Sequence, residues 1–462
     1  MLLRIIPLVL LVVSAPAAAA ARDAADPAIV FVDVNVVPMD RDIVLRHHVV
    51  EVRGSMISYV GPSRGYSVPA GARIIQARGK FMIPGLADMH MHVAEPWRAG
   101  GFLAQYVAFG VTSLRSLSGD PALLRLRDSI DRGEMIAPRL WVSGPIITGQ
   151  GGNPDSDVDK VVASSPAEAR QIVSSQIDAG YDVIKLYDLL SRDAFLAAVH
   201  EAKRRGAYVV GHLPDAVKLE TALSSGLDEI AHADELVSYH WIGYDPAHAD
   251  WQVDLTSFKI DYERIPETAS LLLRHRQSVV SNLVTDETVY RGIEDSDALL
   301  RETEYRRLPG PLRHEWSDSG RFLRWKGQGP YRREVIQPFL KRLVLQLNRS
   351  GVPLTVGSDL GVEGIVPGHH LLRDIEILEE AGLTPFDALA AATRNAALVA
   401  ARMRKPDNFG TIANGQRADL VLLSRNPLET VRHLRTVRGV MVKGRWLTGE
   451  RLKAARLGKD KL

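Results

Sequence analysis

The chain has 462 residues, and its 57 basic side chains nearly balance its 55 acidic ones. This balance does not favour a nucleic acid or an anionic membrane surface as a partner. The absence of cysteine excludes disulfides, a thiol nucleophile and thiolate metal ligands, so any bound metal ion must be held by histidine and oxygen ligands.

The first 21 residues have the pattern of a secretory signal peptide. Arg4 precedes an apolar run at residues 5–13, and small residues, mostly alanine, follow as far as Ala21. The run is too short to span a bilayer. We expect cleavage near residues 20–22 and a periplasmic or secreted protein without membrane attachment; an uncleaved anchor is the alternative.

Both ends of the remaining chain have the pattern of short antiparallel strands. β-Branched residues alternate with polar ones, and turn residues separate the runs. The expected strands are residues 28–37, 43–52, 56–62, 410–412, 418–423 and 437–446. We expect residues 28–84 and 405–450 to form one composite β-sandwich domain that brackets the rest of the chain.

Residues 85–404 alternate short apolar runs with helical stretches, which is typical of βα units and a parallel sheet. The expected strands are residues 87–92, 111–115, 139–142, 183–187, 208–212, 229–232, 278–283 and 354–358. Eight strands predict an α/β fold of the (β/α)8 TIM-barrel type, which takes roughly 250 residues or more. A helix is expected to begin at Thr384-Pro385, a capping residue followed by proline.

Residues 238–346 depart from this regularity because they are rich in tryptophan and tyrosine. The residues in question are Tyr239, Trp241, Tyr244, Trp251, Tyr262, Trp316, Trp325 and Tyr331. We expect elaborated loops over the mouth of the barrel, where loops commonly carry specificity. A packing insertion or a homo-oligomer contact stays open as an alternative.

The first expected barrel strand offers part of the ligand set of a metal site. Asp88, His90 and His92 share one face of a strand because alternate side chains point the same way. Two imidazoles at this spacing can bind one divalent cation. The pattern alone is weak, since structural histidines can produce it.

Four more residues of ligand type lie inside or at the ends of later expected strands: Lys185, His212, His232 and Asp359. Each has an ordinary explanation by itself, such as a lysine that reaches solvent or an aspartate in a turn. Together with the two histidines of the first strand, they fall where the functional side chains of a barrel gather.

The lysine requires a chemical explanation, because an ammonium group would be repelled by two cations. Reaction of its neutral amine with carbon dioxide would give a carbamate, an anionic ligand with two oxygens that can bridge two metals. Four neutral imidazoles, one carboxylate and one carbamate would leave two divalent cations with a net charge of two plus. A water between them should then ionise to a bridging hydroxide near neutral pH.

These residues resemble the metal site of the amidohydrolase superfamily, and the likeness runs from about residue 28 to residue 446. Residues 380–389, 392–397 and 415–423 are similar to the branch that contains imidazolonepropionase-like and prolidase-like (Xaa-Pro dipeptidase-type) peptidases. Residues 144–153 depart from the family, since they replace its usual glycine-and-histidine loop.

The resemblance implies a role for each ligand. His90, His92 and Asp359 would hold the first metal and His212 and His232 the second, with Lys185 as a carboxylated bridge. Asp359 would act as general base and then acid. Asp359, Lys185 and His232 would form the catalytic group, and Asp88 would be a structural carboxylate.

The expected substrates are dipeptides or N-acyl amino acids, which carry a free carboxylate that an Arg or Tyr could bind. Arg115 and Tyr187 are the candidates. The leading hypothesis is therefore an exported amidohydrolase with two divalent cations, expected to be zinc, that cleaves amide bonds by attack of the bridging hydroxide. The alternatives are a mononuclear cyclic-amide hydrolase or deaminase, and a non-enzymatic binding scaffold.

Overall fold

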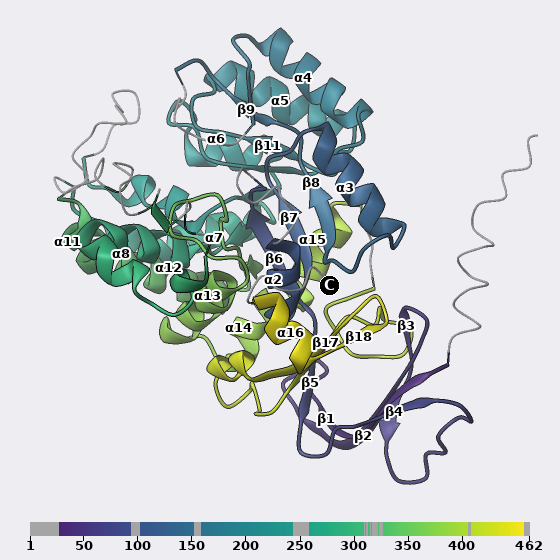
Figure 1. Ribbon diagram of the computed structural model, residues 1–462. Coiled ribbons are helices and arrows are strands. Elements are labelled where there is room, and N and C mark those ends of the chain that lie inside the picture. Colours follow the sequence, from purple (N-terminus) through teal and green to yellow (C-terminus); the bar gives the residue numbers. More distant parts are fainter. Residues whose placement is uncertain are drawn as a thin grey trace, which may run out of the picture.

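The computed structural model describes residues 27–93, 102–151, 159–243, 258–308, 310, 313–314, 316, 322, 327–404 and 408–456 (Figure 1). The expected signal peptide lies outside these residues, as do Tyr244, Trp251 and Trp325 of the aromatic-rich region. Within the described part of the chain, no helix combines the length and the hydropathy that crossing a bilayer requires.

The strands of the two chain ends share one sheet, in the order β18-β17-β16-β5-β1-β2-β3, and β4 pairs with β1. Their bounds are β1 (Ile29–Val36), β2 (Leu45–Arg53), β3 (Met56–Pro62), β4 (Arg73–Gln76), β5 (Phe81–Pro84), β16 (Leu420–Leu423), β17 (Val437–Val442) and β18 (Arg445–Thr448). The antiparallel pair of β16 and β5 joins the C-terminal strands to the N-terminal ones. The last N-terminal strand of this sheet, β5, ends at Pro84, two residues before the first strand of the central unit begins at Leu86.

Details of this sheet differ from the sequence-based expectation. Residues 410–412 are not a strand, although Ile412 N donates to Pro38 O at 2.9 Å. The single strand expected at residues 437–446 is two strands, because Lys443 and Gly444 have positive φ angles and form a turn. The four-residue strands β4 and β5 were not expected. A two-layered sandwich stays a prediction.

The central part of the chain is built on parallel strands, which confirms the α/β class. The strands are β6 (Leu86–Met91), β7 (Val111–Ser116), β8 (Arg139–Val142), β9 (Ile146–Thr148), β10 (Lys160–Val162), β11 (Ile184–Leu186), β12 (Val209–Gly211), β13 (Glu229–Ile230), β14 (Ser278–Val280) and β15 (Leu354–Thr355). Their sheets have the orders β6-β7-β8 and β10-β9-β11-β12-β13-β14-β15. Each expected strand overlaps an observed one, although β13, β14 and β15 are shorter than expected and the strand expected at residues 278–283 runs into the helix that begins at Leu283. The strands β9 and β10 are additional.

Backbone contacts connect these two sheets. Ser143 and Val183 form an isolated parallel bridge between the ends of β8 and β11. Met89 N, in β6, donates to Val356 O at 2.9 Å, and Asp359 N donates to His90 O at 2.8 Å. The segment that follows β15 therefore lies alongside β6.

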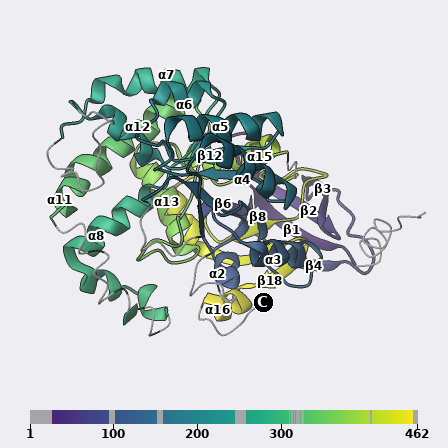
Figure 2. The same cartoon turned by 90° about the horizontal axis from the view of Figure 1, so that it is seen from above.

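Helices lie around the outside of the central strands (Figure 2). They are α2 (Phe102–Ala108), α3 (Pro121–Asp131), α4 (Pro166–Asp178), α5 (Arg192–Arg204), α6 (Leu219–Ser224), α7 (Ile265–Arg274), α8 (Leu283–Leu300), α11 (Gly329–Tyr331), α12 (Gln337–Arg349), α13 (His369–Glu380), α14 (Pro385–Ala391), α15 (Arg394–Arg402) and α16 (Gly449–Arg456). The predicted start of α14 is confirmed, since Thr384 Oγ1 accepts from Asp387 N at 3.1 Å.

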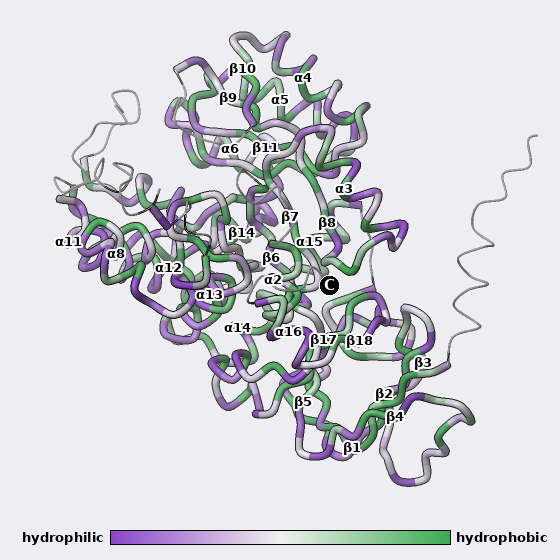
Figure 3. The backbone as a smooth tube through the Cα atoms, in the orientation of Figure 1, coloured by the Kyte–Doolittle hydropathy of each residue, from purple (hydrophilic) through white to green (hydrophobic). Residues whose placement is uncertain are grey.

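The apolar core lies between these helices and the central strands, and both contribute hydrophobic residues to it (Figure 3). Every residue of β6, β7, β11 and β12 is buried. Strands covered on both faces are expected in a parallel sheet with helices around it. Polar residues inside such strands therefore need partners within the protein.

Candidate metal centre

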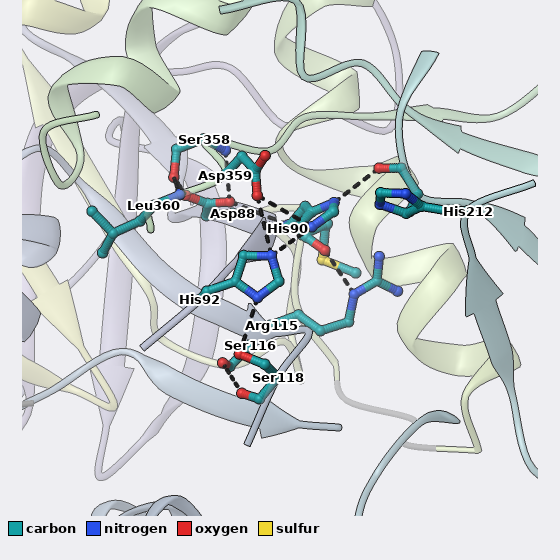
Figure 4. A network of polar contacts seen from close by, with 12 residues as sticks. Asp88, His90, His92, Arg115, Ser116, Ser118, His212, Ser358, Asp359 and Leu360 are labelled. Atoms are coloured by element: carbon teal, nitrogen blue, oxygen red, sulfur yellow. Dashed lines mark hydrogen bonds and ion pairs between the residues drawn. The ribbon is translucent and has the colours of Figure 1, made fainter. Parts of the chain in front are cut away.

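Strand β6 and the residue directly after it place the first two histidines in buried positions. His90 is 0% exposed and His92 is 8% exposed. Nε2 of His90 lies 3.2 Å from Nε2 of His92. Oδ1 of Asp359 lies 3.4 Å from the first nitrogen and 3.2 Å from the second. Figure 4 shows both imidazoles and the Asp359 carboxylate turned toward one another.

The spacing of these three atoms fits a single divalent cation. Ligand atoms around a tetrahedral zinc ion stand about 3.3 Å apart, because each lies about 2.0–2.1 Å from the ion. Burial raises the pKa of Asp359, but its hydrogen bond to His92 and the nearby His232 outweigh that effect and lower the pKa to about 2. The carboxylate is therefore ionised and can serve as an anionic ligand.

Partners on the outer side of the two imidazoles fix their orientation. Nδ1 of His90 lies 2.9 Å from Ala231 O, and Nδ1 of His92 lies 3.0 Å from Ser118 Oγ. An Nδ1–H group that donates outward leaves Nε2 free to bind a metal, as is usual for metal-ligating histidines. Burial lowers the pKa of both histidines, which favours the neutral imidazole that a metal requires.

Asp88 joins β6 to the segment that carries Asp359. Its carboxylate accepts from Ser358 N at 3.1 Å, from Ser358 Oγ at 2.6 Å and from Tyr106 Oη at 3.0 Å. It also accepts from His90 N at 3.2 Å. Burial raises the pKa of Asp88 to about 7 despite these hydrogen bonds. The contacts agree with the structural role expected of this residue.

Two glycines allow the Asp359 segment to approach β6 closely. A Cβ atom on Gly357 would lie 2.6 Å from Cβ of His90, and one on Gly361 would lie 3.1 Å from Cβ of His92. Asp359 itself has a φ of 55°, a left-handed conformation that is uncommon outside glycine. Local sequence and backbone geometry together bring the carboxylate to the histidines.

Lys185 of β11 is fully buried, and its Nζ has no hydrogen-bond partner among the described residues. A buried ammonium group without a partner is costly. Burial lowers the pKa of Lys185 to about 8, although Asp359 and Glu235 favour its charged form. The nitrogen has no partner, and its lowered pKa makes the neutral amine available for reaction with carbon dioxide. Both observations fit a carbamate that completes a metal site.

His232 and His212 extend the cluster away from His90. The ring centroids of His90 and His232 lie 4.2 Å apart, and those of His232 and His212 lie 4.7 Å apart. His90, His232 and Asp359 each offer a ligand atom within 4.8 Å of the other two. Of the six predicted ligands, His90 and Lys185 lie in β6 and β11, and the other four lie in the segments that follow β6, β12, β13 and β15.

Two carboxylates on the outer side of His212 were not predicted. Its Nδ1 lies 2.9 Å from Glu235 Oε1 and also contacts Asp188 Oδ1. Burial lowers the pKa of His212, but Glu235 and Asp188 outweigh it and raise the pKa to about 9. A signal existed in the sequence, since Asp188 follows Lys185 by three residues and Glu235 follows His232 by three.

The two predicted substrate-binding residues have different surroundings. Arg115 is fully buried, donates from Nε to Met89 O at 2.7 Å and forms an ion pair with Glu229. This ion pair gives the guanidinium a carboxylate partner inside the protein, so the geometry does not favour contact with substrate. Tyr187 is half-buried, and its ring centroid lies 4.2 Å from that of His212, at the edge of the cluster.

The fold and this constellation define a metal-dependent hydrolase class. The sequence profile described as Amidohydrolase family matches residues 81–447, and the chain belongs to this family. The resemblance inferred from the ligand residues is therefore confirmed.

Similar proteins differ in their reported activities. The solved bottromycin amidohydrolase is 26% identical with a TM-score of 0.72, and the match covers 96% of this chain and 94% of that one. A Xaa-Pro dipeptidase with bound methionine is 20% identical with a TM-score of 0.65, covering 91% and 100%. Among curated relatives, an adenine deaminase of Paracoccus denitrificans (strain Pd 1222) is 42% identical over 66 residues, 14% of this chain. That match spans only 11% of the relative's own length.

Proposed function

We propose that this protein is an exported amidohydrolase with two divalent cations, zinc in the first instance, that cleaves the amide bond of dipeptides or N-acyl amino acids. The observation that carries the proposal is the position of Lys185. Lys185 has a fully buried amine without a hydrogen-bond partner in the described structure. It interacts electrostatically with all four imidazoles of the cluster and with the Asp359 carboxylate. A bridging carbamate between two metals would account for both the burial and the missing partner.

Each ligand has a role in this proposal. His90, His92 and Asp359 would hold one cation, and His212 and His232 the other, with carboxylated Lys185 between them. When bound, the cations would polarise the substrate carbonyl and acidify water at the site. Asp359 would accept the proton of the attacking water and deliver it to the leaving nitrogen.

The architecture around the site is part of the proposal. We propose that the eight strands β6, β7, β8 and β11–β15 close into a barrel, which the backbone contacts of β8 with β11 and of β6 with the segment after β15 support. The lobe of residues 28–84 and 405–450 would be a separate domain.

Export rests on the composition of residues 1–21. Mass spectrometry of the protein from a periplasmic fraction tests export, because removal of the signal peptide would lower the mass of the chain.

Turnover of a defined substrate set tests the activity. Protein loaded with zinc in bicarbonate buffer is assayed against a library of dipeptides and N-acyl amino acids, with Lys185→Met as the control that cannot form a carbamate. The proposal predicts release of a free amino acid by the wild type and a loss of at least a thousandfold in kcat/KM for the variant. Failure of the loaded wild type to cleave any member would contradict it.

A deaminase is the second candidate, because curated relatives that match parts of the chain are adenine deaminases. Such an enzyme would release ammonia from adenine instead of an amino acid from a dipeptide. A single metal per chain would also favour this reading, since one cation has no need of a bridging ligand. Release of ammonia from adenine is assayed with the same zinc-loaded preparation as the dipeptide library, so the two functions can be compared directly.

A further inference from the structure

Asn282 has a buried side-chain amide that the fold does not use. The residue lies two positions after β14, directly before α8, and is 4% exposed. Neither Nδ2 nor Oδ1 has a hydrogen-bond partner among the described residues. Buried amides are nearly always hydrogen-bonded, so this exception requires an explanation.

Helix capping is the usual reason for an asparagine at this position, but it does not apply here. Asn282 makes no side-chain hydrogen bond to the first turn of α8. Asp374 of α13 takes that role instead, because its Oδ1 accepts from Val284 N at 3.0 Å. The Asn282 amide is therefore not needed to begin the helix.

The backbone conformation does not explain the side chain either. Asn282 has φ 47° and ψ 26°, which lie in the left-handed region. Asparagine tolerates this region, but glycine adopts it at lower cost. The backbone alone would therefore favour a residue without an amide.

The amide lies next to the candidate metal centre. An ideal Cβ on Gly357 would be 3.0 Å from Nδ2 of Asn282 and 2.6 Å from Cβ of His90. Asn282 and His90 thus pack against the same position of the segment after β15, and the absence of a side chain at Gly357 allows this close approach. Asn282 follows β14 on the side of the strands where the metal ligands gather.

We infer that Asn282 is a substrate-binding residue of this site, which rests on the function proposed above. Its Nδ2 donates a hydrogen bond to an oxygen of the bound substrate, and its Oδ1 accepts one from a substrate N–H group. A side-chain carboxamide is complementary to a peptide unit, which also offers one acceptor and one donor. The site therefore selects substrates that carry an amide group or an amino acid.

The test compares Asn282→Gly and Asn282→Asp with the wild type. Glycine removes the amide and suits the left-handed backbone, whereas aspartate keeps the size but removes the donor. Arg276→Gly is the matched control, because exposed Arg276 has a φ of 54° at the opposite end of β14. Each protein is assayed for zinc content, for kcat and KM on the best library substrate, and for the shift in Tm caused by the amino-acid product.

We expect both Asn282 variants to bind zinc as the wild type does, with KM raised at least tenfold and the product-induced Tm shift lost. Arg276→Gly should retain the wild-type KM and shift. If Asn282→Gly fails to fold, Asn282→Asp carries the test alone. An unchanged KM and an unchanged Tm shift would overturn the inference, as would loss of zinc. A wild type that cleaves nothing in the library would overturn the proposed function, and the inference with it.

Discussion

Glu235 lies outside the candidate ligand set but contacts one of its members, His212. Its Oε1 faces Nδ1 of His212, while Oε2 accepts from Leu213 N at 2.7 Å. The carboxylate is therefore held in place by the backbone and can fix the orientation of the imidazole. Carboxylate partners of this kind typically contribute 10- to 100-fold to metal affinity.

We predict that Glu235→Gln weakens zinc binding by about 10- to 100-fold, because the amide holds the His212 ring less firmly. Competition with a chromogenic chelator measures the affinity. Glu220→Gln, a change on the exposed surface of α6, serves as the control. Equal zinc affinity for Glu235→Gln and the wild type would show that this carboxylate does not position His212.

Tyr187→Phe is predicted to raise KM for dipeptides several-fold without loss of zinc. The ring would still pack against His212, but the hydroxyl could no longer donate to a substrate carboxylate. Steady-state kinetics and metal analysis of the same sample separate the two effects. If the kinetic constants do not change, Tyr187 does not contact the substrate.

At the residue scale, the sequence was informative where several ligand types recur at strand ends. His90, His92, Lys185, His212, His232 and Asp359 could be selected in this way. The ion pair of Arg115 with Glu229 could not be predicted, because Glu229 lies 114 positions away in the chain. The unpaired amide of Asn282 was not visible in the sequence for a related reason, because it is a property of the packed structure.

Among the elements, the segment after β15 depends on the absence of a side chain at Gly357. We predict that Gly357→Ala destabilises the protein by about 1–3 kcal/mol, since the new Cβ would overlap His90 and Val280. It should also reduce zinc binding, because Asp359 lies two residues further on. Urea unfolding and zinc titration test this, with Gly310→Ala as control because that position is open. Wild-type stability of Gly357→Ala would contradict the packing described.

The start of α8 is predicted to be sensitive to pH through Asp374. Burial outweighs hydrogen bonds from Ser281 and Val284 and raises the pKa of Asp374 to about 6. In the unfolded chain this carboxyl titrates near pH 3.9. Its stabilising contribution is therefore complete below about pH 4 and is lost as the pH rises through about 6.

Asp374→Asn removes this titration. The unfolding free energy of the wild type relative to the variant should fall by roughly 2 kcal/mol between pH 4 and pH 7. Urea unfolding of both proteins across this range measures the difference, in which the other titrating groups cancel. A difference that does not vary with pH would show that the pKa of Asp374 is the same in the folded and unfolded chains.

Element positions followed from hydrophobic pattern and turn residues to a large extent. All eight central strands were located, because each is a buried apolar run bounded by glycine, proline or polar residues. The strands β4, β5, β9 and β10 were missed, although they are no shorter than several strands that were located. Residues 410–412 show the opposite error, because a strand was expected there and the structure has none.

The whole molecule joins its two ends in one sheet, so the central unit begins and ends beside the same strands. Leu420 of β16 pairs with Pro84 of β5, directly before β6 begins. Sequence patterns could indicate a shared lobe but not this pairing, because register depends on tertiary contacts. The sheet leads directly into β6, which contains the candidate ligand His90 and is followed directly by the candidate ligand His92.

The central claim is that one chain holds two cations bridged by carboxylated Lys185. The most direct measurement is the zinc bound per chain after loading in bicarbonate buffer and gel filtration, for the wild type and for Lys185→Ala. The account predicts two zinc ions per wild-type chain and at most one in the variant. One zinc ion per wild-type chain, unchanged in Lys185→Ala, would contradict it.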